Sequence, residues 1–129
     1  MDTKKHEVLY IEDDPYSMLV MRHIFRKKFS NCIFAEAFAV EKGIELARLS
    51  RPSLILMDLK FVGMDGYEGL KQLRLLPETV DIDVWAVSAS VLEDEIQKGL
   101  RAGFSEYIAK PMDLAAFTRK LKQYFVFAK

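Results

Sequence analysis

The sequence predicts an α/β domain built on a doubly wound, five-stranded parallel sheet flanked by five helices. Short apolar segments alternate with segments of helical periodicity along the whole chain. The apolar segments are nearly continuous, as strands covered on both faces require. Alternation of strands and helices implies right-handed crossovers and hence a parallel sheet. A length of 129 residues suits one domain, and we expect residues 1–129 to form it.

The first half of the chain predicts two strand–helix units. An apolar run at 8–11 precedes Asp14 and Pro15, which suit the N-cap and first position of a helix. Apolar residues then recur at helical spacing for several turns. A second apolar run covers 31–37, and helical spacing resumes over 40–49.

The third strand is predicted at 53–57, the most continuous apolar run, which ends directly before Asp58. A glycine-containing loop at 61–66 leads into a helix that we expect to continue through Leu76. Pro77 ends this helix, because proline has no backbone N–H to continue it.

Two further units complete the sheet. The fourth strand is predicted at 84–87, and the helix at 93–102 has Gly103 as its C-terminal cap. The fifth strand is predicted at 107–109. Asp113 then caps a last helix, which extends to about residue 125.

Polar side chains gather at the carboxyl ends of four predicted strands. In doubly wound sheets the reactive site lies at this edge. The residues concerned are Glu12, Asp13, Asp14, Asp58, Ser88 and Lys110. Two carboxylates about 4 Å apart repel by roughly 4 kcal/mol at an effective dielectric near 20. A divalent cation relieves this repulsion, and oxygen ligands without sulfur or imidazole favour Mg²⁺, or Mn²⁺ in its place. Carboxylate, metal, ammonium and hydroxyl together fit an aspartyl-phosphate intermediate.

At these residues the sequence resembles the receiver domains of two-component response regulators. The matching segments occur in the right order and with family-like spacing over nearly the whole chain; they are 9–14, 55–59, 64–66, 87–89 and 107–111. The resemblance implies a flavodoxin-like receiver fold. The pattern is closest to receivers of hybrid histidine kinases and is also compatible with a stand-alone regulator.

The resemblance implies a phosphoacceptor and a set of metal ligands. Asp58 would accept the phosphoryl group and also contact Mg²⁺. Asp13 would bind the ion directly and Glu12 through water, while Lys60 would offer its backbone carbonyl. Val62 stands where most receivers have a proline, which is a departure from the family pattern.

The resemblance also implies a switch. Ser88 would move to hydrogen-bond the phosphoryl group, and Lys110 would pair with its oxygens. Tyr107 would then turn inward and change the face formed by the fourth helix, fifth strand and fifth helix. A dimer through that face is a further expectation. The implied donor is a histidine kinase or a histidine phosphotransfer protein.

Simpler interpretations apply to several of these residues. Asp14 is more simply a helix cap than a metal ligand. Tyr107 could be ordinary core packing, and Trp85 core or partner surface. His23 on the first predicted helix is best interpreted as surface, and Cys32, in an apolar run, as a buried inert thiol.

Composition narrows the classes of function. Nineteen basic residues balance nineteen acidic ones, so we expect neither nucleic acid nor an anionic membrane as a direct partner. The polar N-terminal segment and the absence of a long apolar stretch favour a cytoplasmic location. The predicted role is signalling, in which the domain assists its own phosphorylation and dephosphorylation rather than acting as an enzyme. The alternative is a receiver-like binding module that is not phosphorylated. A phosphatase of the haloacid dehalogenase type would need a second Asp where Lys60 stands.

Overall fold

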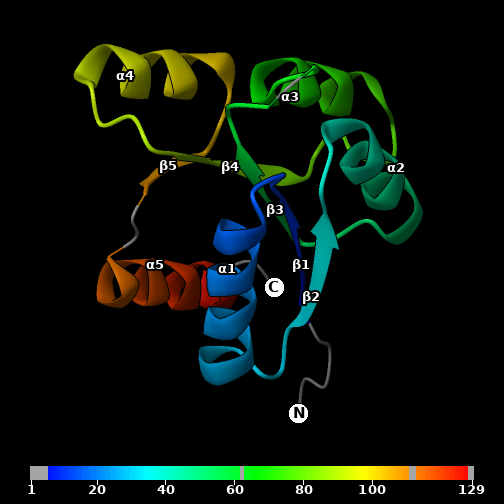
Figure 1. The fold of residues 1–129 in the computed structure, drawn as a ribbon. Helices are drawn as coiled ribbons and strands as arrows, with labels where there is room; N and C mark the ends of the chain where they lie inside the picture. The colour runs from blue at the N-terminus through cyan, green and yellow to red at the C-terminus, as the bar shows by residue number, and fades with distance from the viewer. Residues whose placement is uncertain (1–5, 62, 111–112, 128–129) are drawn as a thin grey trace.

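A computed structural model describes residues 6–61, 63–110 and 113–127. Five parallel strands form one sheet in the order β2-β1-β3-β4-β5 (Figure 1). The strands are β1 (Glu7–Ile11), β2 (Ile33–Ala37), β3 (Leu54–Asp58), β4 (Asp83–Ser88) and β5 (Glu106–Ala109). The helices are α1 (Pro15–Lys28), α2 (Val40–Ser50), α3 (Gly66–Leu75), α4 (Glu93–Ala102) and α5 (Leu114–Phe127). The predicted doubly wound α/β class is confirmed, and the strand order reverses between β1 and β3.

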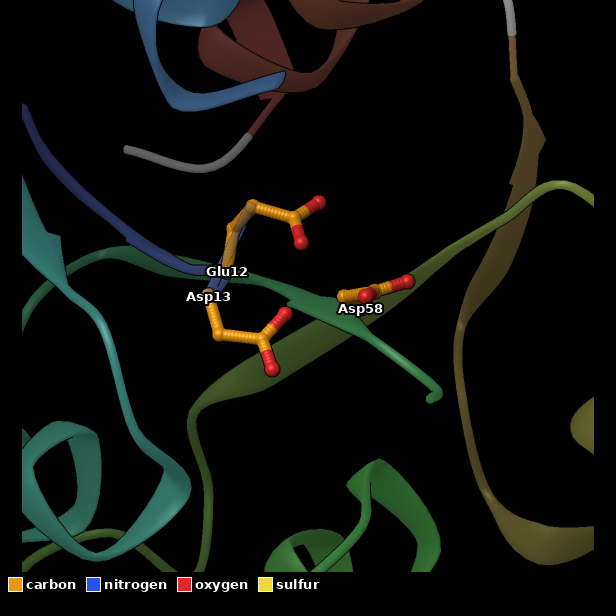
Figure 2. A group of neighbouring side chains, drawn as sticks. All are labelled: Glu12, Asp13 and Asp58. Carbon is orange, nitrogen blue, oxygen red and sulfur yellow. The ribbon is translucent and has the colours of Figure 1, made fainter. Parts of the chain in front are cut away.

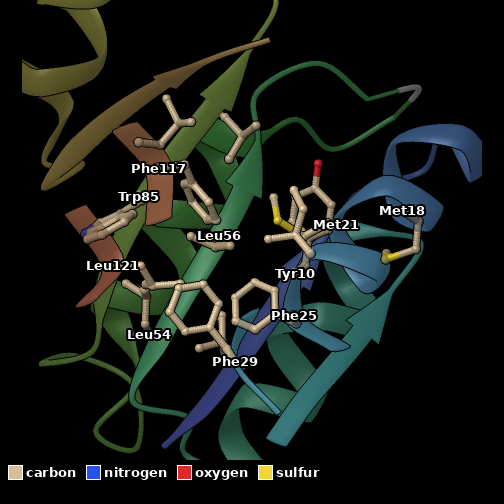
Figure 3. Packing of buried hydrophobic residues seen from close by; sticks show 14 residues of the cluster. Tyr10, Met18, Met21, Phe25, Phe29, Leu54, Leu56, Trp85, Phe117 and Leu121 are labelled. Carbon is tan, nitrogen blue, oxygen red and sulfur yellow. The ribbon is translucent and has the colours of Figure 1, made fainter. Parts of the chain in front are cut away.

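Helices cover both faces of the sheet. Figure 1 shows α1 and α5 on one side and α2, α3 and α4 on the other. Successive strand residues point to opposite faces, so each strand contributes to two cores. On the α1/α5 side, Figure 3 shows Phe25 of α1 and Phe29, the residue that caps α1, near Leu54 of β3. On the opposite side, Ile55 packs with Leu70 and Leu73 of α3.

The central strand β3 carries Asp58 at its carboxyl end. All five of its residues are buried. It pairs with β1 on one side and β4 on the other, and Asp58 lies opposite Val87 in the register. The start of α3 packs closely behind it, since a Cβ at Gly66 would lie 2.5 Å from the carbonyl oxygen of Asp58. Pairing with β4 and the close approach of α3 therefore fix the position of this residue.

The predicted caps are present. The side chain of Asp14 accepts a hydrogen bond from the Ser17 amide at 3.0 Å, and that of Asp113 accepts one from the Ala116 amide at 3.0 Å. Gly103 closes α4 with φ of +117°, a left-handed conformation that favours glycine.

Several predicted boundaries differ from the structure by one or two residues, and two of the differences have a clear local reason. Helix α3 ends at Leu75, because Leu76 precedes Pro77 and adopts an extended conformation instead of a helical one. Strand β2 begins at Ile33 instead of residue 31, because a turn follows α1 in which the Cys32 amide donates to the Phe29 carbonyl at 2.9 Å.

Three other expectations concern the packing of single side chains. Trp85 lies in the core, and His23 is exposed on α1. Cys32 is half-buried against the edge of the α1/α5 core. The prediction of a buried thiol is therefore wrong in degree, because the side chain lies at the margin of the core and keeps contact with solvent. Among the residues that the structure describes, the helices are too short or too polar to cross a bilayer.

Candidate functional site

Three carboxylates meet at the carboxyl edge of the sheet. Glu12 and Asp13 follow β1 directly, and Asp58 is the last residue of β3. Because Ile11 pairs with Met57, the residues after β1 lie level with the end of β3. One carboxylate oxygen from each of the three lies within 4.8 Å of the others, and Figure 2 shows the side chains around a common space.

Glu12 is held in a fixed, buried position. Only 1% of its surface is exposed. Its Oε1 accepts a hydrogen bond from the Tyr10 hydroxyl at 2.9 Å, and its Oε2 accepts one from the Asp14 amide at 3.2 Å. Burial and the Glu12 charge raise the pKa of Tyr10, so its phenol remains a donor. Tyr10 was not singled out in the sequence, although it shares a strand face with Glu12 at a spacing of two residues.

Asp58 is nearly as buried and less well compensated. The Leu59 amide donates to its Oδ1 at 3.0 Å, and Lys110 Nζ lies 3.5 Å from the same atom. Burial, together with the neighbouring Glu12 charge, raises the pKa of Asp58 to about 7. An aspartate in this state gains from a nearby cation, which favours its ionised form.

Lys110 supplies the positive charge of the cluster. Its backbone amide donates to the Ser88 carbonyl at 2.8 Å, which sets the end of β5 beside the end of β4. Its ammonium lies 2.5 Å from Glu12 Oε1. Burial alone would lower the pKa of Lys110, but the Glu12 hydrogen bond and the Asp58 charge outweigh burial and raise it. The side chain is therefore a cation at neutral pH.

Asp13 is exposed, in contrast to its two carboxylate neighbours. The three carboxylates offer only oxygen ligands, two of them buried and one open to solvent. This donor set fits a hard cation such as Mg²⁺, which prefers one or two carboxylates and retains several waters. The fit depends on the chemistry of these donors and on the uncompensated charge that burial leaves on Asp58.

Ser88 and Tyr107 are linked through one residue. The buried Ser88 hydroxyl oxygen accepts a hydrogen bond from the Ser90 amide at 3.3 Å. The Tyr107 hydroxyl donates to the Ser90 carbonyl at 3.0 Å. Tyr107 is half-buried at the edge of the core on the α3/α4 side. The side chain of Lys60 is exposed, and its carbonyl as a metal ligand stays a prediction. Val62 and Pro111 lie outside the described residues.

A cavity of about 770 Å³ opens beside Lys110. It runs along α1 to the start of α5, and its lining includes exposed apolar side chains; these are Tyr16, Leu19, Val20 and Leu114. Sequence reasoning missed this surface. A signal was available in the apolar residues of α1 that lie off its buried stripe.

Comparison with known families identifies the domain. The model of the response regulator receiver domain matches residues 8–122. The chain belongs to the response regulator receiver family. Receiver domains are signalling domains of two-component systems and are homologous to phosphoacceptor domains.

Individual relatives support this assignment. The receiver is 30% identical over 124 residues to the probable C4-dicarboxylate response regulator DctR of Bacillus subtilis, which covers 96% of this chain and 54% of that protein. The chain thus spans about half the length of that relative. It is 27% identical to sporulation initiation phosphotransferase F of the same organism, covering 92% of this chain and 94% of the relative.

A solved structure resembles the receiver closely in fold. The receiver domain of sensor histidine kinase PA1611 from Pseudomonas aeruginosa superposes with a TM-score of 0.84 at 24% identity, over 95% of this chain and 99% of the other. That domain has a magnesium ion coordinated in its active-site cleft. At this level of identity, the likeness shows the shared fold.

Proposed function

We propose that this chain is a phosphoacceptor whose Asp58 takes a phosphoryl group from a phosphohistidine in a Mg²⁺-dependent reaction. One observation carries the proposal. The carboxylates of Glu12, Asp13 and Asp58 share one space at the sheet edge, with the Lys110 ammonium within 3.5 Å of Asp58. Membership of the receiver family and a magnesium-bound structural neighbour add support.

The proposed metal ligands follow from the donor set. Asp13 and Asp58 would hold Mg²⁺ directly, Glu12 through a water, and Lys60 through its backbone carbonyl. When bound, the ion supplies positive charge that offsets the phosphoryl oxygens and the crowded carboxylates. The raised pKa of Asp58 supports this assignment, because a nearby cation favours the ionised carboxylate that acts as the nucleophile.

The protein groups would act in sequence around Asp58. A carboxylate oxygen attacks phosphorus, a new O–P bond forms, and the P–N bond of the donor breaks with its electron pair left on the imidazole nitrogen. The Lys110 ammonium would leave Glu12 and pair with a phosphoryl oxygen. The Ser88 hydroxyl would turn from the Ser90 amide and donate to another oxygen. Both groups already lie at the strand ends beside Asp58.

The donor would approach over α1. The cavity beside Lys110 is lined by the exposed apolar side chains of Tyr16 and Leu19, a surface suited to a protein rather than to a small molecule. This surface supports a histidine kinase or a histidine phosphotransfer protein as the partner. It also favours phosphoryl transfer and signalling over turnover of a metabolite.

The test uses acetyl phosphate as a small phosphoryl donor. With Mg²⁺, the intact mass of the wild-type protein should increase by one phosphoryl group, and a chelator should prevent the increase. Asp58→Asn should gain nothing, whereas Asp81→Asn, which alters an exposed aspartate, should label like the wild type. A wild-type protein that binds Mg²⁺ but gains no mass would overturn the proposal and favour a binding module that is not phosphorylated.

Broader features of the receiver are proposals of the same kind. We infer that residues 1–129 act as one receiver domain in the cytoplasm, without direct contact to nucleic acid or membrane. A dimer through the face of α4, β5 and α5 would form on phosphorylation. Sedimentation of the protein before and after treatment with acetyl phosphate tests this association, and an unchanged mass would argue against the dimer.

A further inference from the structure

Tyr67, in the first turn of α3, has a buried hydroxyl without a hydrogen-bond partner among the described residues. Such hydroxyls are rare, because removal from water without a compensating bond costs free energy. Burial raises the pKa of Tyr67, and the nearby Glu95 and Tyr107 raise it further, so the hydroxyl keeps its proton. It is therefore an unused donor inside the protein.

The ring of Tyr67 joins α3 to α4. It packs edge-on against Phe104, with ring centroids 5.8 Å apart and an interplanar angle of 78°. The ammonium of Lys98 in α4 lies 4.6 Å from the centroid of the Tyr67 ring. These contacts come from α4 and from the residue that follows its cap, so a movement of α4 changes the surroundings of Tyr67.

Tyr67 and Tyr107 meet at the same position on α4. A Cβ at Gly99 would lie 3.0 Å from Cδ2 of Tyr107 and 3.9 Å from the hydroxyl of Tyr67. Glycine at this position allows the Tyr107 ring to lie directly against the helix backbone. The two tyrosines are thus neighbours across one buried residue of α4.

A chain of hydrogen bonds links this position to the acceptor site. The Ser88 hydroxyl accepts from the Ser90 amide, and the Ser90 carbonyl accepts from the Tyr107 hydroxyl. Movement of Ser88 toward a phosphoryl group would break its hydrogen bond with the Ser90 amide. The Ser90 backbone could then shift, and the Tyr107 hydroxyl would lose its bond to the Ser90 carbonyl. Tyr107 would then be free to change its position against Gly99, beside the unpaired hydroxyl of Tyr67.

We propose that Tyr67 is a positioning residue of this switch, whose hydroxyl lacks a partner in the unphosphorylated state and gains one when Tyr107 and α4 rearrange. A group that is satisfied in only one of two states shifts the equilibrium toward that state. The Tyr67 hydroxyl therefore disfavours the unphosphorylated arrangement. The inference rests on the proposed phosphorylation of Asp58.

The test compares the wild type with Tyr67→Phe, using Mg²⁺ and beryllium fluoride as a phosphoryl mimic in calorimetric titrations. Loss of the hydroxyl should raise the melting temperature of the unliganded protein and weaken beryllium fluoride binding about three- to tenfold. Because the proposed coupling passes through Ser88, the effect of Tyr67→Phe on affinity should disappear in a Ser88→Ala background.

Tyr124→Phe is the matched control. On the opposite face of the sheet, the Tyr124 hydroxyl lies 3.0 Å from the Ser53 carbonyl oxygen and 2.9 Å from the Asp83 carboxylate, and it can donate its proton to either. Its loss should lower the melting temperature and leave beryllium fluoride affinity unchanged. Equal affinities for the wild type and Tyr67→Phe would overturn the inference about Tyr67. A wild type that binds Mg²⁺ but not beryllium fluoride, and is not labelled by acetyl phosphate, would instead overturn the proposed function.

Discussion

Lys110 pairs more closely with Glu12 than with Asp58. Its Nζ lies 2.5 Å from Glu12 Oε1 and 3.5 Å from Asp58 Oδ1. Lys110 therefore compensates the charge of the more buried acid first, and the pKa of Asp58 remains raised. Any positive charge that binds in the cluster acts mainly on Asp58, and any phosphoryl group there competes with Glu12 for the lysine.

Removal of Lys110 should destabilise the metal-free protein. Lys110→Ala leaves the Glu12 charge buried without its ion pair, which costs about 2–4 kcal/mol. Urea unfolding in a chelator measures the loss, and added Mg²⁺ should restore part of it. Lys42→Ala, which breaks an exposed pair with Glu45, should change stability by less than about 0.5 kcal/mol. Equal losses in the two variants would contradict the role of Lys110 in compensating Glu12.

Stability in the absence of metal should fall as pH rises. The folded state raises the pKa of Asp58 from 3.8 to about 7, so it binds this proton more tightly than the unfolded chain does. The resulting stability is fully present below pH 4 and is lost as pH rises through about 7, by about 1–3 kcal/mol. Urea unfolding at pH 5 and pH 8 measures it. Asp58→Asn should remove this loss and should be more stable than the wild type at pH 8.

Two controls accompany the pH experiment. Asp81→Asn, at an exposed position, should keep the wild-type decline in stability. Mg²⁺ should stabilise the wild type more at pH 8 than at pH 5, because the ionised Asp58 carboxylate is the form that binds a cation. A wild-type stability that rises over this range in the chelator would show that Asp58 is already ionised at low pH.

Gly66 should tolerate no side chain. A Cβ there would lie 2.5 Å from the Asp58 carbonyl oxygen and 2.9 Å from the Leu59 Cα, both backbone atoms. Gly66→Ala should cost about 1–3 kcal/mol and slow acetyl phosphate labelling, because the end of β3 must move. At Gly63 a Cβ would have no atom within 4 Å, so the cost of Gly63→Ala comes only from the positive φ of +91°. It should cost about 1 kcal/mol and leave the labelling rate unchanged.

A charge on the outer face of α1 should slow phosphoryl transfer from a protein donor but not from a small-molecule donor. Leu19 is 55% exposed and lines the cavity beside Lys110. Leu19→Glu should slow transfer from a phosphorylated histidine phosphotransfer protein by about tenfold or more and leave labelling by acetyl phosphate unchanged. Leu49→Glu, at an exposed position on α2, should affect neither reaction. Equal rates of transfer to the wild type and to Leu19→Glu would show that the protein donor binds at another surface.

The sequence could predict which residues meet at the carboxyl edge of the sheet, because parallel strands bring their carboxyl ends to one edge. Glu12, Asp58 and Lys110 follow strand ends, so their convergence depends only on strand order. The competition between Glu12 and Asp58 for Lys110 could not be predicted. It depends on the depth of each side chain and on the Tyr10 hydroxyl, and strand patterns do not encode either.

Features that depend on contacts between helices were also inaccessible from the sequence. The Tyr67 hydroxyl, which has no hydrogen-bond partner among the described residues, lies where α4 approaches α3. Hydrophobic periodicity does not specify that approach. The end of α3 at Leu75 could have been predicted, because a residue before proline avoids the helical conformation. The residue before Pro77 is Leu76, which the sequence had placed in the helix.

Because β3 is buried between β1 and β4, the position of Asp58 does not depend on the side chains of the outer helix faces. Asp58 is anchored by pairing with Val87 of β4 and by the close approach of Gly66. Under the proposed function, substitutions on the outer faces of α1, α4 or α5 would therefore alter which protein is recognised and leave Asp58 in place. A laboratory selection for new partners could change those surfaces freely while the strand ends are kept constant.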